Sequence, residues 1–163
     1  MKRTDRNPSR WPALAGALAL GAMAAPAFAG DVDSAHANRR CERQFEAAQR
    51  IDMESFRDYD AEAFRAGHTD DAVTIFASGD VFVGIDAIME ALARHFEDQE
   101  AVWEWTELYR AVQGCKTAFI LYETTYEIPS VGFFQRALTG VSYTYHRGAW
   151  LANADQGTLL PPE

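Results

Sequence analysis

Asp52 is a carboxylate in an apolar setting. When residues 40–59 are placed on a helical wheel, Phe45, Phe56 and Tyr59 fall on one face, and Asp52 lies near its centre. A carboxylate that is removed from water must be paired, hydrogen-bonded or protonated. Burial also raises the pKa of such a group, which suits it to acid or base catalysis near neutral pH. Asp52 therefore either belongs to a functional site or is satisfied by buried water, a tyrosine hydroxyl or an arginine.

His68 is a second candidate, because histidine exchanges protons near neutral pH. It follows a predicted short helix and precedes Thr69, Asp70 and Asp71. The alternative is a structural role, in which His68 caps the end of that helix or pairs with Asp70.

The segment 103–109 has the alternation of a half-buried strand. With a period of two, one face carries Trp103, Trp105, Glu107 and Tyr109. Aromatic rings beside one carboxylate are typical of a pocket lining with a polar group. The alternative is that the aromatic rings belong to the core and that Glu107 lies in water at the end of the sheet. Glu123 and Tyr143 belong to neighbouring predicted strands, and we expect them to face the same cavity.

Several catalytic motifs are missing from the sequence. It contains no G-x-S-x-G turn, no phosphate-binding glycine loop and no dinucleotide fingerprint. The four histidines lack the spacing of metal ligands, and two cysteines cannot form a cysteine cluster. We therefore expect neither a metal nor another cofactor.

Residues 1–29 have the pattern of a secretory signal peptide. A cationic start precedes an Ala-rich apolar stretch, which ends in the cleavage motif Ala27-Phe28-Ala29. A transmembrane anchor is the alternative, but the stretch between Pro12 and Pro26 is shorter than the roughly 20 residues that span a bilayer. We expect an exported product, periplasmic or secreted, with no stable membrane insertion after cleavage.

Charge narrows the range of partners. The whole chain has a net charge of −9, and removal of residues 1–29 takes away four cations and one anion. Such an acidic surface excludes nucleic acid as an expected partner.

In an oxidising compartment, the pair Cys41 and Cys115 indicates one disulfide, and two separately buried thiols are the alternative.

The remaining pattern predicts helices first and then long strands. Residues 30–38 are polar and expected to be flexible. Helices are predicted at 39–59, 61–67 and 86–96, and short strands at 73–76 and 81–83. Long strands are predicted at 101–112, 116–128, 135–145 and 149–155. Short turns between successive strands favour antiparallel pairing, so we expect a single α+β domain over residues 39–160.

These elements resemble the nuclear transport factor 2-like superfamily and, within it, the SnoaL-like group. The motifs that carry the resemblance are His68-Thr69-Asp70-Asp71-Ala72-Val73, Gly84-Ile85-Asp86-Ala87-Ile88 and Trp150-Leu151 followed by Asp155-Gln156-Gly157-Thr158. The resemblance covers about residues 40–160. It implies a curved antiparallel sheet that forms a cone around the N-terminal helices, with a pocket at the open end. It also implies a homodimer through the outer face of the sheet.

The superfamily includes ketosteroid isomerases, whose site consists of a tyrosine on the first helix and two aspartates. Gap-free counting from Asp70 and Asp71 places that tyrosine at Asp52 and the catalytic base at Phe76. The deeper aspartate falls near Val141. The isomerase triad is therefore absent, and steroid isomerisation is not implied.

Two hypotheses remain. In the first, the protein is a cofactor-independent lyase, isomerase or cyclase that acts on a small apolar carbonyl compound. Asp52 is then the proton shuttle, His68 or Glu107 its partner, and Tyr143 a donor to a developing oxyanion. The expected ligand-binding residues are Phe56, Phe76, Trp103, Trp105, Tyr109 and Glu123. In the second hypothesis, the chain is a non-catalytic ligand-binding or dimerisation module.

Overall fold

The computed structural model describes residues 30–161, and the predicted signal peptide lies outside this range. Helix α1 (Gly30–Arg57) begins at Gly30 rather than at residue 39, and α2 (Ala61–Ala66) follows it. The Asp60 carboxylate caps α2 by accepting a hydrogen bond from the Ala63 amide at 2.9 Å. In the described residues, no helix is long and apolar enough to cross a membrane.

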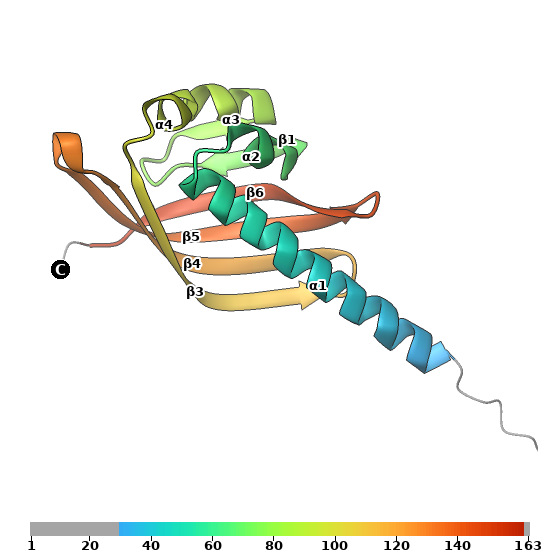
Figure 1. Cartoon of the computed structure of the whole chain (residues 1–163). Coiled ribbons are helices and arrows are strands. Elements are labelled where there is room, and N and C mark those ends of the chain that lie inside the picture. Colours follow the sequence, from blue (N-terminus) through green and yellow to red (C-terminus); the bar gives the residue numbers. More distant parts are fainter. Residues whose placement is uncertain (1–29, 162–163) are drawn as a thin grey trace, which may run out of the picture.

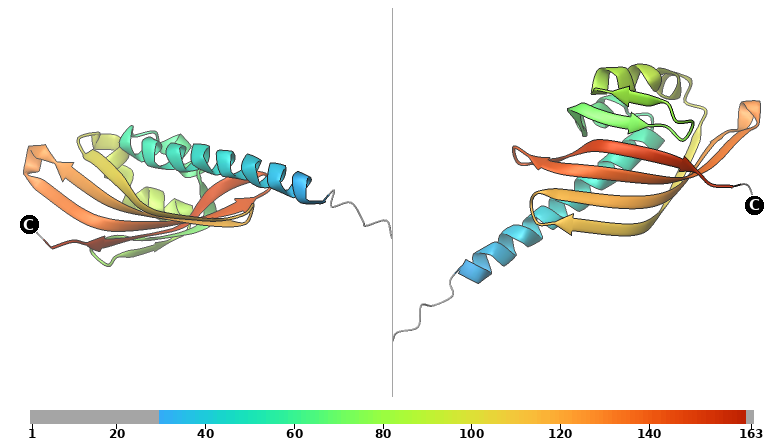
Figure 2. Two further views of the ribbon diagram at one scale, coloured as in Figure 1. Left: turned by 90° about the horizontal axis from the view of Figure 1, so that it is seen from below. Right: turned by 180° about the vertical axis from the view of Figure 1, so that it is seen from behind.

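The region predicted as one helix at 86–96 consists of two short helices. These are α3 (Ile85–Ala91) and α4 (Ala93–Asp98), separated at Leu92. Both lie with α2 near the C-terminal end of α1, whereas α1 itself runs diagonally across one face of the sheet (Figures 1 and 2).

The sheet has six strands in the order β2-β1-β6-β5-β4-β3. Their bounds are β1 (His68–Ile75), β2 (Val81–Val83), β3 (Val102–Gln113), β4 (Thr117–Ile128), β5 (Phe133–His146) and β6 (Ala149–Leu159). A short 3-10 helix, η1 (Pro129–Val131), lies in the β4–β5 connection. Neighbouring strands pair antiparallel except β1 and β6, which are parallel. The α+β prediction is confirmed, and the curved sheet stays open, with β2 and β3 at its edges.

Two bulges interrupt the alternation of side chains along the long strands. In β3, Glu107 pairs with Tyr122 and Tyr109 pairs with Leu121, so Leu108 is the extra residue. In β6, Ala152 pairs with Tyr143 and Ala154 pairs with Ser142, so Asn153 is the extra residue. Each bulge moves the following side chains to the opposite face of the sheet.

The core consists of two clusters of buried side chains. In the first, Phe45 and Met53 of α1 pack on the concave face of the sheet against Ile120, Tyr122, Tyr143 and Trp150. In the second, Phe64, Ile88 and Phe96 of the short helices pack against Ala72 of β1, and Phe56 of α1 lies beside them. Helix α1 therefore contributes to both clusters.

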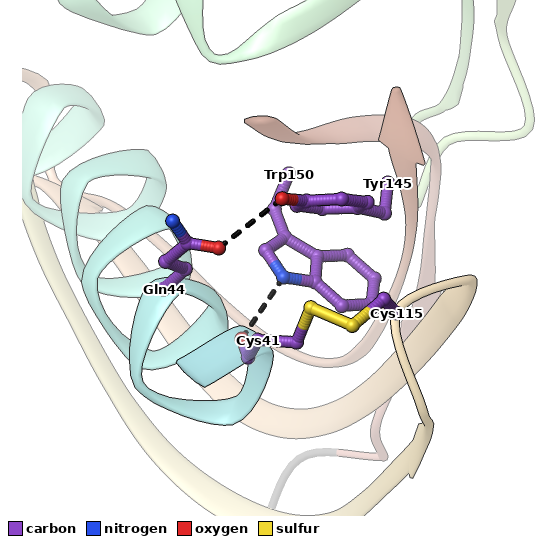
Figure 3. Close-up of a disulfide and its surroundings, with 5 residues drawn as sticks. All are labelled: Cys41, Gln44, Cys115, Tyr145 and Trp150. Carbon is purple, nitrogen blue, oxygen red and sulfur yellow. Dashed lines mark hydrogen bonds between the residues drawn. A yellow bond between two sulfur atoms is a disulfide. The ribbon is translucent and has the colours of Figure 1, made fainter. Parts of the chain in front are cut away.

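A disulfide joins α1 to the turn between β3 and β4. The Cα atoms of Cys41 and Cys115 lie 5.5 Å apart, so the predicted bridge is confirmed. Beside it, the Trp150 indole donates to the Cys41 carbonyl at 3.1 Å, and the Tyr145 hydroxyl donates to the Gln44 side chain at 3.2 Å (Figure 3). These contacts fix the middle of α1 against the sheet. The disulfide is also consistent with an oxidising environment.

Candidate functional site

A cavity of about 540 Å³ lies between the helices and the concave face of the sheet. Its lining is largely apolar. Five residues that the sequence pointed to are part of this lining: Asp52, Phe56, His68, Phe76 and Trp103. This volume lies in the range of small-molecule sites in proteins.

The Asp52 carboxylate is buried at the wall of this cavity, with 6% of the residue exposed. The Tyr143 hydroxyl donates to Oδ2 at 2.6 Å, and His68 Nε2 lies 3.7 Å from Oδ1. Burial raises the pKa of Asp52, and the positive field of His68 and the Tyr143 hydrogen bond oppose that effect without cancelling it. The carboxylate anticipated on the apolar face of the helix is thus sheltered from water.

His68 is the first residue of β1 and is also buried. Its Nδ1 lies 2.7 Å from the Phe64 carbonyl oxygen at the end of α2. Because a carbonyl only accepts, Nδ1 carries the proton and donates it, and Nε2 faces Asp52. The predicted helix-capping contact and the approach to Asp52 are therefore made by the two nitrogens of one ring.

Tyr143 lies beside the cavity rather than in its lining, with 2% exposed. Burial, together with the negative charge of Asp52, raises the pKa of its hydroxyl well above the ordinary value. The hydroxyl therefore stays protonated and donates to Asp52. The structure assigns it to holding that carboxylate and does not expose it to a substrate oxyanion in the cavity.

Asp155 of β6 is an ionisable cavity residue that sequence reasoning missed. The Thr74 hydroxyl donates to its Oδ2 at 2.6 Å, and burial raises the pKa of Asp155 to about 6. Strict alternation from Trp150 would place Ala154 and Gln156 inward. The bulge at Asn153 turns Asp155 inward instead, and the sequence carries no clear signal for that bulge.

An aromatic wall continues from Phe56 away from the acidic residues. The ring of His95 in α4 stacks on Phe56 with centroids 3.8 Å apart. His95 Nε2 donates to the Phe56 carbonyl at 2.7 Å, and the Tyr126 hydroxyl donates to Nδ1 at 3.1 Å. Burial lowers the pKa of His95, so this ring is neutral and braces the wall.

Four predicted site residues lie elsewhere. Trp105 and Glu123 border a shallow groove near the edge strand β3, where the Arg57 guanidinium lies 5.5 Å from the Trp105 ring centroid. Glu107 accepts a hydrogen bond from Arg110 at 2.7 Å, which lowers the pKa of its carboxyl. The prediction that Tyr109 shares the face of Trp103 and Trp105 is wrong, because the Leu108 bulge places Tyr109 on the outer face.

The cavity therefore brings together Asp52, His68 and Asp155, which reach it from three separate elements. Among residues 30–161, no group of three or more His, Cys, Asp or Glu side chains is arranged to hold a metal ion. The chemistry that these side chains themselves offer is proton transfer in a mostly apolar space.

Comparison with solved structures identifies the fold. No family model matches the chain, and no curated protein matches its sequence. The chain is similar to an NTF2-like protein with a cystatin-like fold from Novosphingobium aromaticivorans, with a TM-score of 0.68, 13% identity, and coverage of 85% of this chain and 94% of that one.

Two further structures have the same architecture. A ketosteroid isomerase-like protein from Erwinia carotovora atroseptica has a TM-score of 0.58 and 21% identity over 72% of this chain and 94% of that one. A putative Ca/calmodulin-dependent kinase II association domain from Exiguobacterium sibiricum has a TM-score of 0.61 and 16% identity over 75% and 95%. At these identities the likeness shows the fold alone, and this chain has the fold of nuclear transport factor 2-like proteins.

Proposed function

We propose that this protein is a cofactor-independent lyase, isomerase or cyclase that moves a proton on a small, largely apolar carbonyl compound. The observation that carries the proposal is the buried Asp52 carboxylate at the wall of the 540 Å³ cavity, with His68 beside it. Burial of this carboxylate costs free energy that Tyr143 and His68 offset only in part, so its position at the wall of a cavity favours a catalytic role.

The reaction begins with an ionised Asp52 beside His68. Asp52 takes a proton from the carbon next to the substrate carbonyl, and the electron pair of the broken C–H bond forms an enolate. Asp52 then returns the proton to another carbon in an isomerisation, or to a leaving group in an elimination. His68 stabilises the charged form of Asp52, and Tyr143 holds the carboxylate in place. The apolar walls exclude water and favour transfer of the proton to the Asp52 carboxylate.

Proton exchange tests this function without knowledge of the natural substrate. The protein is incubated with 2-tetralone in heavy water, and the loss of α-hydrogen signal is followed by NMR. We expect exchange faster than in buffer, and a reduction of about 100-fold or more in Asp52→Asn. Asp71→Asn removes an exposed carboxylate from β1 and serves as the matched control. Equal exchange by wild type and Asp52→Asn would contradict the proposal.

A dimerisation role is a second candidate that the outer face of the sheet favours. Ile120 and Tyr122 point into the core, so Phe119 and Leu121 of β4 point outward, next to the displaced Tyr109. Phe119 covers Gly140, where a Cβ atom would lie 3.1 Å from the ring. These side chains form an apolar outer patch, which we propose pairs with the same patch of a second copy.

Export is proposed as well. The disulfide and the signal-like residues 1–29 support it. Mass spectrometry of protein recovered outside the cytoplasm should find Gly30 as the first residue. An intact Met1 on that material would contradict cleavage at this site.

A further inference from the structure

The cavity contains more acidic than basic groups. Asp52 and Asp155 are carboxylates in its lining, and the ionisable cation that faces them is His68. Arg94 is also part of the lining, but its side chain is 90% exposed and pairs with Asp98 at 3.1 Å. When both carboxylates are ionised, these described residues therefore supply at most one neutralising charge for two negative ones.

Asp155 is the carboxylate that this balance leaves with the weaker countercharge, because His68 attracts it without forming an ion pair with it. His68 makes its closer approach to Asp52, where Tyr143 also donates. Among residues 30–161, Thr74 is the hydrogen-bond donor to Asp155, and it contacts Oδ2 alone. A neutral hydroxyl stabilises a carboxylate but does not cancel its charge. Oδ1 is thus available to a donor in the cavity.

The rest of the cavity is suited to an apolar cation. Six aromatic residues belong to the lining: Phe56, Phe64, Phe76, Trp103, Tyr126 and Phe133. The negative faces of aromatic rings attract organic ammonium groups, most strongly where water is excluded. The net charge of −9 also favours the approach of cations over that of anions.

We propose that the guest of this cavity is an organic ammonium ion, an apolar body with one protonated amine whose nitrogen donates to Asp155. The inference rests on the proposed function for the proton chemistry at Asp52, and it adds the chemical class of the substrate. Asp155 anchors the ammonium group, the aromatic residues hold the apolar body, and Asp52 with His68 handles the transferred proton. The substrate is therefore a carbonyl compound that also carries a basic nitrogen.

Binding of such a guest depends on pH through the groups that face it. These are Asp52 on α1, His68 on β1, Arg94 and His95 on α4, Tyr126 on β4 and Asp155 on β6, and Tyr143 on β5 contacts Asp52 from behind the lining. Burial keeps His95 neutral, and the two tyrosines stay protonated. As pH falls, Asp155 takes up a proton with a pKa of about 6 and loses its attraction for the cation. Affinity at pH 5 should be about tenfold weaker than at pH 8.

The test compares two probes of equal size, 2-phenylethylammonium and the neutral 2-phenylethanol. Their affinities for the purified protein are measured by isothermal titration calorimetry at pH 8 and pH 5. At pH 8 we expect the ammonium ion to bind at least tenfold more tightly than the alcohol. Asp155→Asn should abolish that preference, and the charge-matched surface variant Asp71→Asn should retain it. Near-UV circular dichroism checks the folding of each variant.

Equal binding of the two probes, tighter binding of the alcohol, or no binding of either probe would overturn the inference. The pH comparison uses the unaltered protein, so it remains decisive even if Asp155→Asn does not fold. Asp52→Asn separates the two proposals, because it should stop proton exchange and keep the ammonium preference. If the unaltered protein has no preference for the ammonium ion but exchanges the protons of 2-tetralone normally, the inference of an amine in the substrate fails and the proposed function still holds.

Discussion

Replacement of Tyr143 by phenylalanine should raise the pKa of Asp52. The Tyr143 hydroxyl donates to Asp52 Oδ2 at 2.6 Å, and this bond favours the ionised carboxylate. Tyr143→Phe removes the donor and leaves the ring contact with Phe45 in place, where the centroids lie 5.1 Å apart. The substitution therefore changes the electrostatics of Asp52 with little change in packing.

The magnitude follows from the strength of hydrogen bonds to charged groups. Such a bond contributes about 1.5 to 3 kcal/mol, and one pH unit corresponds to about 1.4 kcal/mol. The pKa of Asp52 should therefore rise by about one to two pH units in Tyr143→Phe. The sign is fixed, because loss of a donor disfavours the charged form.

Carbon-detected NMR of the aspartate carboxyl groups measures this change, with Asp52→Asn used to assign the signal. Tyr145→Phe is the matched control, because its hydroxyl donates to Gln44 near the disulfide and not to Asp52. It should leave the titration of Asp52 unchanged. An unchanged or lower Asp52 pKa in Tyr143→Phe would contradict this prediction.

Three other predictions concern stability and assembly. The free energy of unfolding should fall as pH rises from 4 through 6, because the fold holds Asp155 protonated while the unfolded chain ionises it near 3.8. Over this range Asp155 alone lowers the free energy of unfolding by about 3 kcal/mol, and urea unfolding of Asp155→Asn should lack that decrease. A variant with the same pH profile as the wild type would contradict the raised pKa of Asp155. The double variant Cys41→Ala/Cys115→Ala should lose about 4 kcal/mol against urea, since the bridge joins residues 74 positions apart, and a loss below about 1 kcal/mol would count against it. Light scattering should find a dimer for the wild type and a monomer for Tyr109→Glu, whereas Val131→Glu in η1 should remain dimeric; a monomeric wild type would exclude the proposed pairing.

The sequence predicts the parts of the fold that depend on periodicity. The apolar face of α1 identified Asp52 as out of place, and the four long runs between turn residues became strands β3 to β6. The nuclear transport factor 2-like resemblance also holds at the level of the fold. These features could be predicted because a helical or alternating pattern is repeated over many residues.

The errors arise where one residue breaks that repetition. Leu108 displaces Tyr109 to the outer face, and Asn153 brings Asp155 into the cavity. The parallel pairing of β1 with β6 could not be read from turns, because it joins strands far apart in the chain. The Thr74 contact to Asp155 depends on that pairing, so the sequence did not indicate that Asp155 joins Asp52 at the cavity.

The most direct test of the whole account is the pKa of Asp52 in the unaltered protein, measured by carboxyl NMR. We predict that this pKa lies above the ordinary value of 3.8, because the carboxylate is buried beside the cavity. A value at or below 3.8 would mean a fully stabilised carboxylate with little capacity to take up a proton, and it would contradict the proposed catalytic role.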